Sequence, residues 1–276
     1  MIKYVIKRLL LMIPILLAIV LIVMLLMAVT PGDPARIVAG TTATEEEYQQ
    51  VKEDLGLNQP LLVRYVKFVA GAIHGDFGTS FITKTDVFHD IMTRFPYTFI
   101  LATFSVILAV AIGIPLGILA ATHQNTIVDY AASIIALIAS SMPGFWLALL
   151  LVKWFAVDIR LFPVSGTATW KGWVLPIVSL ALGYAASISR MTRSSTLETI
   201  RQDYVTTARA KGVPERTVLY RHVLKNSLIP VITNVGSLYG MALGGALIQE
   251  TIFSLPGLGT YTIVALTNRD YPVIQG

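Results

Sequence analysis

Long apolar blocks dominate the pattern along this chain and predict membrane-spanning helices. The blocks lie at about Leu9–Val29, Tyr97–Ala121, Tyr130–Val157, Val174–Ile188 and Leu228–Ile252. A helix needs about 20 apolar residues to cross a bilayer, and these blocks are too long and too continuously apolar for barrel strands. Helices also satisfy their own backbone hydrogen bonds in lipid. We therefore expect five spans, with the short fourth block extending into its flanking residues.

The first block needs to be distinguished from a cleaved signal peptide. Lys3, Lys7 and Arg8 precede it, as basic residues precede a signal sequence. The apolar run Leu9–Val29 is longer than a typical signal-peptide core, and no cleavage site of small residues follows it. We interpret it as a retained first helix, kinked or tilted near Pro14.

The polar stretch after the first block predicts a small helical cap. Thr44 followed by three glutamates is typical of a capped helix start, and Gly56 predicts the end of that helix. Pro60–Ile73 has the spacing of an amphipathic helix, and Val87–Phe95 predicts a third. The predicted organisation is a tail and first transmembrane helix, an extracytoplasmic cap, and a core transmembrane domain, at 1–30, 31–96 and 97–276.

Composition and charge support this interpretation and orient the chain. Hydrophobic residues make up 55% and charged residues 13%, whereas a soluble domain carries roughly 25% charged residues. Residues 190–225 hold eight basic side chains against three acidic ones, and 31–96 hold six against nine. The positive-inside rule therefore places the N-terminal tail and the 190–227 loop in the cytoplasm and 31–96 outside. No basic run with interleaved aromatic residues suggests nucleic-acid binding.

The basic loop also has helical spacing. Leu197, Ile200, Tyr204 and Ala208 fall on one helical face. Gly212 predicts the end of this helix, and Pro214 suits the first turn of a second helix that runs to Lys225 and groups Val218, Leu219 and His222. Composition alone favours an amphipathic pair lying on anionic headgroups over a surface that docks a protein, but leaves both open.

The same loop carries a family resemblance. The run Asp203–Gly212, which reads Asp-Tyr-Val-Thr-Thr-Ala-Arg-Ala-Lys-Gly, is similar to the cytoplasmic signature of binding-protein-dependent ABC importer permeases. That signature is Glu-Ala-Ala, three residues, Gly, nine residues and Ile-x-Leu-Pro. The first Glu is replaced by Thr206, the Ile by His222 and the final Pro by Lys225. At these positions the chain is instead similar to the dipeptide, oligopeptide and nickel branch of the family. The run Arg221–Asn226 resembles the same branch.

Further segments resemble this branch in the expected order and extend the likeness over nearly the whole chain. They lie at Pro31–Pro34, Leu55–Leu61, Gly75–Ser80, Ser141–Trp146, Arg190–Ser195 and Glu250–Gly259. In this branch a further span follows a Tyr-Pro-Val-Ile-Gln motif, whereas this chain stops at Tyr271–Gly276. We therefore expect the sequence to lack a final helix of the protein.

The resemblance implies an all-α, polytopic transmembrane helical bundle with the type I ABC importer permease fold. It implies a permease subunit that forms half of the pathway for di- or oligopeptides, in a multi-pass protein of a bacterial-type inner membrane. Its partners would be a homologous second permease, two ATPase subunits and an extracytoplasmic substrate-binding protein, besides the lipid bilayer. No Walker-type phosphate loop occurs in this chain, so ATP and Mg would bind the ATPase subunits, and no cofactor is expected here.

Other substrates and another class of transporter remain as alternatives. A nickel, metal-chelate or glutathione importer permease would belong to the same branch. A self-sufficient secondary transporter should show intramembrane acids or paired broken helices, and no Asp or Glu lies clearly at mid-membrane in the predicted spans.

The resemblance assigns roles to residues of the loop, and polarity suggests others. It makes 203–217 the segment that docks in an ATPase cleft, through Asp203, Tyr204, Thr207, Ala208, Arg209, Ala210, Lys211, Gly212 and Glu215. Ser141, Pro143, Gln249 and Glu250 are candidates for the translocation pathway. No catalytic set or metal site is expected, because there is no cysteine and the nearby His74 and Asp76 lack a third ligand.

Overall fold

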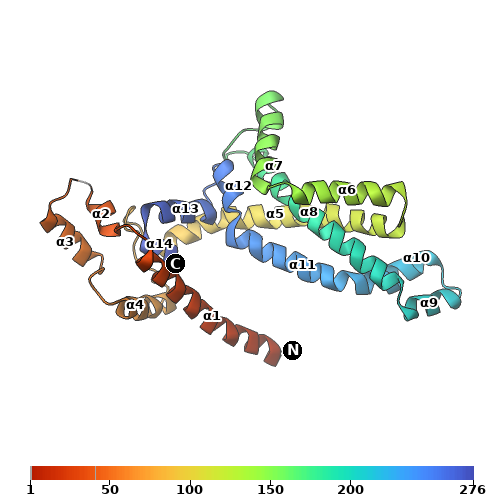
Figure 1. Ribbon diagram of the computed structural model, residues 1–276, viewed down its shortest axis with the longest axis horizontal. Helices are drawn as coiled ribbons and strands as arrows, with labels where there is room; N and C mark the ends of the chain where they lie inside the picture. The colour runs from red at the N-terminus through yellow and green to blue at the C-terminus, as the bar shows by residue number, and fades with distance from the viewer. Residues whose placement is uncertain (1, 41) are drawn as a thin grey trace. The chain divides into compact units, whose positions relative to one another are not determined.

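The computed structural model describes residues 2–40 and 42–276, and its regular elements there are helices (Figure 1). Strand-like pairing in the described residues is limited to an isolated antiparallel bridge between Thr79 and Asp86. The chain divides into two compact units. One comprises the residues up to Phe95 together with Tyr261–Gly276, and the other comprises Pro96–Thr260.

The first unit holds the N-terminal helix, the predicted cap and the last two helices. Its elements are α1 (Ile2–Val29), α2 (Pro34–Ala39), α3 (Glu45–Asp54), α4 (Leu61–Ile73), the start of α5 (Val87–Thr122), most of α13 (Leu258–Asn268) and α14 (Tyr271–Gln275). The predicted cap helices are present, but Val87–Phe95 is not a separate helix. It opens α5, which continues through Pro96.

The cap helices begin and end with the devices that the sequence predicts. Thr44 and Glu47 form a reciprocal capping box at the start of α3. The hydrogen bond that the Thr44 backbone N–H donates to the Glu47 carboxylate holds the pKa of Glu47 below the ordinary value. Gly56 follows the end of α3, and Gly75 follows the end of α4 in the same way. Both glycines have positive φ, +64° and +80°, and the paired backbone hydrogen bonds around them form a Schellman motif.

The C-terminal end of α1 is held by side chains from the last helices. A helix leaves its final carbonyls without intrahelical partners. The Arg269 guanidinium donates to the carbonyls of Thr30, Pro31 and Gly32, and the Tyr271 hydroxyl donates to the carbonyl of Met27, 3.1 Å away. These bonds give a structural reason for a glycine at position 32, since an added Cβ would lie 2.6 Å from the guanidinium.

The second unit holds the remaining spans and the predicted cytoplasmic loop. Besides most of α5 its elements are α6 (Ile127–Ser141), α7 (Gly144–Leu151), the π-helical η1 (Val152–Asp158), α8 (Lys171–Ile200), α9 (Asp203–Ala210), α10 (Glu215–Thr217), the π-helical η2 (Val218–Val223), α11 (Leu224–Gly245) and α12 (Leu247–Ile252).

The predicted spans are present, with two corrections. Among the described residues, four helical stretches are long and apolar enough to cross a membrane, at Ile6–Val29, Val87–Thr122, Lys171–Ile200 and Glu215–Gly244. The block predicted as one span at 130–157 bends by 99° between α6 and α7, where Pro143 cannot donate a backbone hydrogen bond. The last predicted block does not run to Ile252, because Ala246 leaves the helical region with ψ of 34°.

α8 is the interior helix of the second unit, and small residues cover its buried surface. Its buried positions include Ala181, Ala185, Ser189, Thr192 and Ser195. On α5, two glycines four positions apart meet this surface: a Cβ at Gly113 would lie 2.8 Å from the Ala185 carbonyl oxygen, and one at Gly117 would lie 2.6 Å from that of Ser189. Small residues at this spacing let membrane helices approach until their backbones touch.

Enlarging Gly117 should separate these helices. We expect Gly117→Ala to destabilise the protein by about 1–3 kcal/mol, because the added methyl group meets backbone that cannot rotate away. Thermal unfolding of the purified protein in detergent measures the loss. Gly183→Ala on α8 is the control, since its Cβ would meet nothing within 4 Å. Equal unfolding temperatures for the two variants would contradict this account of the packing.

Candidate coupling segment and translocation residues

The segment predicted to dock an ATPase, 203–217, is a short helix closed by a defined turn. α8 ends at Ile200, and α9 begins at Asp203. Gly212 follows the end of α9 with φ of +78°. Its N–H bonds to the carbonyl of Arg209, and the N–H of Val213 bonds to that of Ala208, which together form a Schellman motif. The predicted helix end at Gly212 is therefore confirmed.

The inner face of this segment has a hydrophobic core of its own. Val205, Ala208, Val218 and Val223 are buried together, and Ile200, Val213 and Leu219 pack against them. The predicted apolar face is wrong at Tyr204, which is 43% exposed. The break between α8 and α9 resets the helical register, so that Val205 takes the buried position. The Tyr204 hydroxyl instead accepts a hydrogen bond from Asn226 Nδ2 at 2.9 Å.

The outer face carries the predicted docking residues. Eight of the nine are exposed, namely Asp203, Tyr204, Thr207, Arg209, Ala210, Lys211, Gly212 and Glu215, whereas Ala208 faces the core. Arg209 forms a two-pronged ion pair with Glu215, at 3.0 Å and 2.5 Å, and this hydrogen bonding raises the pKa of Arg209. Because both side chains are exposed, the pair adds at most about 1 kcal/mol of stability. It braces the turn that joins α9 to α10.

A hollow of about 690 Å³ lies beside this segment, between it and the turn that follows α5. Its lining mixes apolar, hydroxyl and charged side chains and is contributed by the ends of α5 and α8 together with the docking segment. The lining residues are Ala121, Thr122, Gln124, Leu197, Ile200, Arg209, Glu215, Arg216, Leu219 and Tyr220. This end of the unit therefore offers a partner a recess as well as a protruding helix.

The first two pathway candidates lie at the bend of the broken span. Ser141 ends α6, and Pro143 immediately precedes α7. They line a largely apolar hollow of about 610 Å³ together with neighbours that include Leu137, Phe145 and Trp146. The structure therefore places these two candidates side by side, and their contact with a solute stays a prediction.

The other two candidates, Gln249 and Glu250, are buried in the second unit. Glu250 is 0% exposed and accepts hydrogen bonds from the Thr98 hydroxyl at 2.6 Å and from the Thr260 N–H at 3.0 Å. A Cβ at Gly257 would lie 2.4 Å from the carboxyl carbon, so a side chain at that position would displace the carboxyl group. Glu250 thus ties α12 to the start of α13, with the loop between these two helices passing close to its carboxyl group. A role in the pathway stays a prediction.

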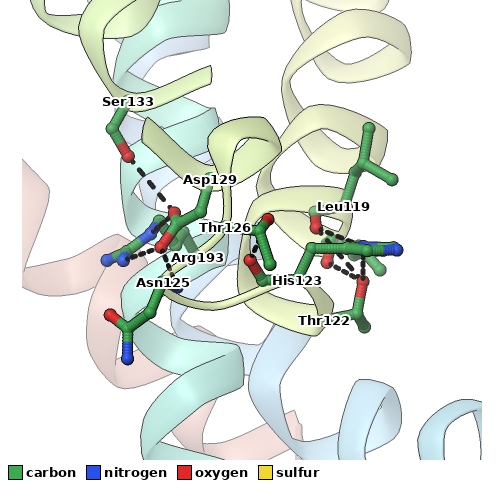
Figure 2. Close-up of polar contacts among 9 residues, drawn as sticks. Leu119, Thr122, His123, Asn125, Thr126, Asp129, Ser133 and Arg193 are labelled. Carbon is green, nitrogen blue, oxygen red and sulfur yellow. Dashed lines mark hydrogen bonds and ion pairs between the residues drawn. The ribbon is translucent and has the colours of Figure 1, made fainter. Parts of the chain in front are cut away.

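A second buried carboxylate, not identified from the sequence, lies at the start of α6. Figure 2 shows the Arg193 guanidinium of α8 directed at the Asp129 carboxylate, with Nε–Oδ1 and Nη2–Oδ2 distances of 2.5 and 2.7 Å. The backbone N–H of Asn125 and the hydroxyl of Ser133 also donate to Asp129. The signal in the sequence for this pair is that an acidic and a basic residue each flank an apolar block. Because the two residues lie 64 positions apart, the sequence alone does not show that they are in contact.

Two known families match most of the chain. Residues 113–276 match the family described as binding-protein-dependent transport system inner membrane component. Residues 1–102 match the N-terminal family of the same membrane components.

Relatives that align with the whole chain are also membrane components of transport systems. The chain is 40% identical over 275 residues to the glutathione transport system permease protein GsiC of Escherichia coli (strain K12), and equally to that of Salmonella typhi. Each alignment covers 100% of this chain and 90% of the relative.

A solved structure shares the fold. A chain of the MetNI methionine ABC transporter, in an inward-facing conformation, superposes with a TM-score of 0.53 at 19% sequence identity. The superposition covers 67% of this chain and 86% of the other, which supports the predicted all-α permease fold. The chain therefore belongs to the family of binding-protein-dependent transport system inner membrane components.

Proposed function

We propose that this chain forms half of the translocation pathway of an ATP-driven importer and couples it to ATP hydrolysis through residues 203–217. Two ATPase subunits bind ATP and Mg, and one of them docks on this segment. A homologous permease supplies the other half of the pathway, and a substrate-binding protein delivers the solute from outside. The N-terminal tail and the 203–217 segment face the cytoplasm, in keeping with the excess of basic residues there.

The observation that carries the proposal is that the segment buries its apolar face within the protein. A helix that lies on headgroups inserts its apolar face into the lipid. Here Val205 and Ala208 pack against Val218 and Val223 instead. The segment therefore keeps its shape without lipid and presents an almost wholly polar surface. This favours docking of a protein over headgroup binding, the alternative that composition alone favoured.

The exposed face of α11 supports a second membrane subunit. Gly236, Gly240 and Gly244 recur every four residues and are exposed, and a Cβ at any of them would meet nothing within 4 Å. Exposed Ile229 and Ile232 continue the same helix. Small residues at this spacing allow another membrane helix to pack closely, so we place the homologous permease against this helix.

For the solute we propose glutathione or another short peptide. The relatives that are 40% identical over the whole chain are named for glutathione transport, and glutathione is itself a tripeptide. Longer peptides and nickel chelates remain the alternatives to test, because the delivering protein sets much of the choice.

Uptake by the complete complex tests the function. In proteoliposomes that contain both permeases and both ATPases, with binding protein outside and ATP inside, we expect uptake of labelled glutathione that ceases without ATP. Competition with unlabelled dipeptides, oligopeptides and nickel chelates ranks the substrates. Uptake by this chain alone, without ATPase subunits, would instead indicate a secondary transporter. If a transported peptide or chelate displaces glutathione, the substrate assignment changes but the proposed importer function stands.

Strain at Gly212 tests the docking segment. We expect Gly212→Ala to lower ATP-dependent uptake, because a side chain at φ of +78° costs about 1–2 kcal/mol and loosens the end of α9. No clash contributes, since the added Cβ would meet nothing within 4 Å. Uptake and ATP hydrolysis are measured at equal amounts of assembled complex.

The matched control for this variant is Gly75→Ala. Gly75 ends α4 through the same Schellman motif, has φ of +80° and also has open space around it. Its substitution should cost similar stability but leave uptake per ATP unchanged. If both variants impair uptake equally, the position of Gly212 has no special role in coupling.

A further inference from the structure

We propose that the Asp129–Arg193 ion pair is a positioning pair, which carries movement of the 203–217 segment into the bent span formed by α6 and α7. The inference rests on the proposed coupling function. The pair lies where the first turn of α6 meets the end of α8 that leads into this segment (Figure 2).

The geometry of the pair suits a firm link. Both carboxylate oxygens of Asp129 are engaged by Arg193, and the Asp129 side chain is 2% exposed. Two-pronged pairs of this kind fix orientation as well as distance. Asn125, held at φ of +63°, donates its N–H to the same carboxylate, so the link includes the turn between α5 and α6.

α6 buries few of its own side chains. Its buried residues are Asp129 and Ala136, whereas apolar side chains such as Ile134, Ile135 and Leu137 are exposed. Among the hydrogen bonds and ion pairs of the described residues, the contact with Arg193 is the one that ties α6 to α8. At the other end of the broken span, α7 is anchored separately, through Ala148 and Leu151 in a core shared with α8.

The α8 end of the link is close to the docking segment. Arg193 lies seven residues before Ile200, about 10 Å along the helix. Two residues after Arg193, Ser195 donates to the carbonyl of Ser227 at 2.7 Å, which ties α8 to α11.

α6 is tied to the second half of α8, whereas α7 packs on the first half, at Leu175 and Leu180. When α8 tilts or bends, its two halves move by different amounts, and the angle at the bend that carries Ser141 and Pro143 changes.

The test removes the pair without leaving a buried charge. Arg193→Gln alone strands the Asp129 carboxylate and risks misfolding, so the informative variant is Asp129→Asn with Arg193→Gln. In the complete complex in proteoliposomes, ATP hydrolysis stimulated by binding protein should persist. Glutathione uptake per ATP hydrolysed should fall roughly twofold to thirtyfold, the range that altered coupling residues produce. Arg190→Gln on exposed Arg190 of the same helix is the control and should leave the ratio unchanged.

The outcomes separate a positioning role from simple stabilisation. A pair that only stabilises the fold would lower the unfolding temperature, and uptake and hydrolysis would fall together with an unchanged ratio, which would overturn the proposal. Arg193→Lys keeps a charge without the fork, and should give a ratio between those of the wild type and the double variant. If the wild-type complex shows no ATP-dependent uptake, the proposed function fails and not the ion pair.

Discussion

Close approach of α8 to its neighbours is the constraint on which the second unit depends. Lipid provides no hydrophobic drive for helices to associate, so packing and hydrogen bonds must hold them together. α8 meets this requirement with alanine, serine and threonine on its buried face and with glycine on the facing surface of α5. Only at such short range can Ser195 reach the backbone of Ser227. The small residues therefore determine both the packing and the polar ties.

Two buried carboxylates complete this arrangement by different means. A buried charge requires compensation, and Asp129 receives it from the guanidinium of Arg193. Glu250 accepts hydrogen bonds from Thr98 and from the backbone of Thr260. The first arrangement joins two helices. The free energy lost by burying the Asp129 charge and the free energy gained from its pairing with Arg193 therefore both depend on where these helices lie. The second ties α12 to the start of α13.

The sequence predicted the elements better than the contacts between them. Apolar length was enough for the spans, and local chemistry was enough for the capped start of α3 and for the end of α9 at Gly212. Local pattern failed at Tyr204, because two residues outside the helix changed the register of the buried face. It could not reveal the partner of Glu250, since Thr98 lies 152 residues away. Such contacts arise from how helices pack, which periodicity within one helix does not specify.

The docking segment reaches the membrane helices by two routes of unequal stiffness. Toward α8 the chain leaves helical conformation at Arg201 and Gln202. Toward α11 a turn at 211–214 joins α9 to α10, after which α10, η2 and α11 follow one another without a break, and α9 packs on η2 through a shared core. The segment and the start of α11 thus form one body, and its displacement reaches α8 through the bond of Ser227 to Ser195. Movement would then pass from α11 to α8 and only afterwards to α6.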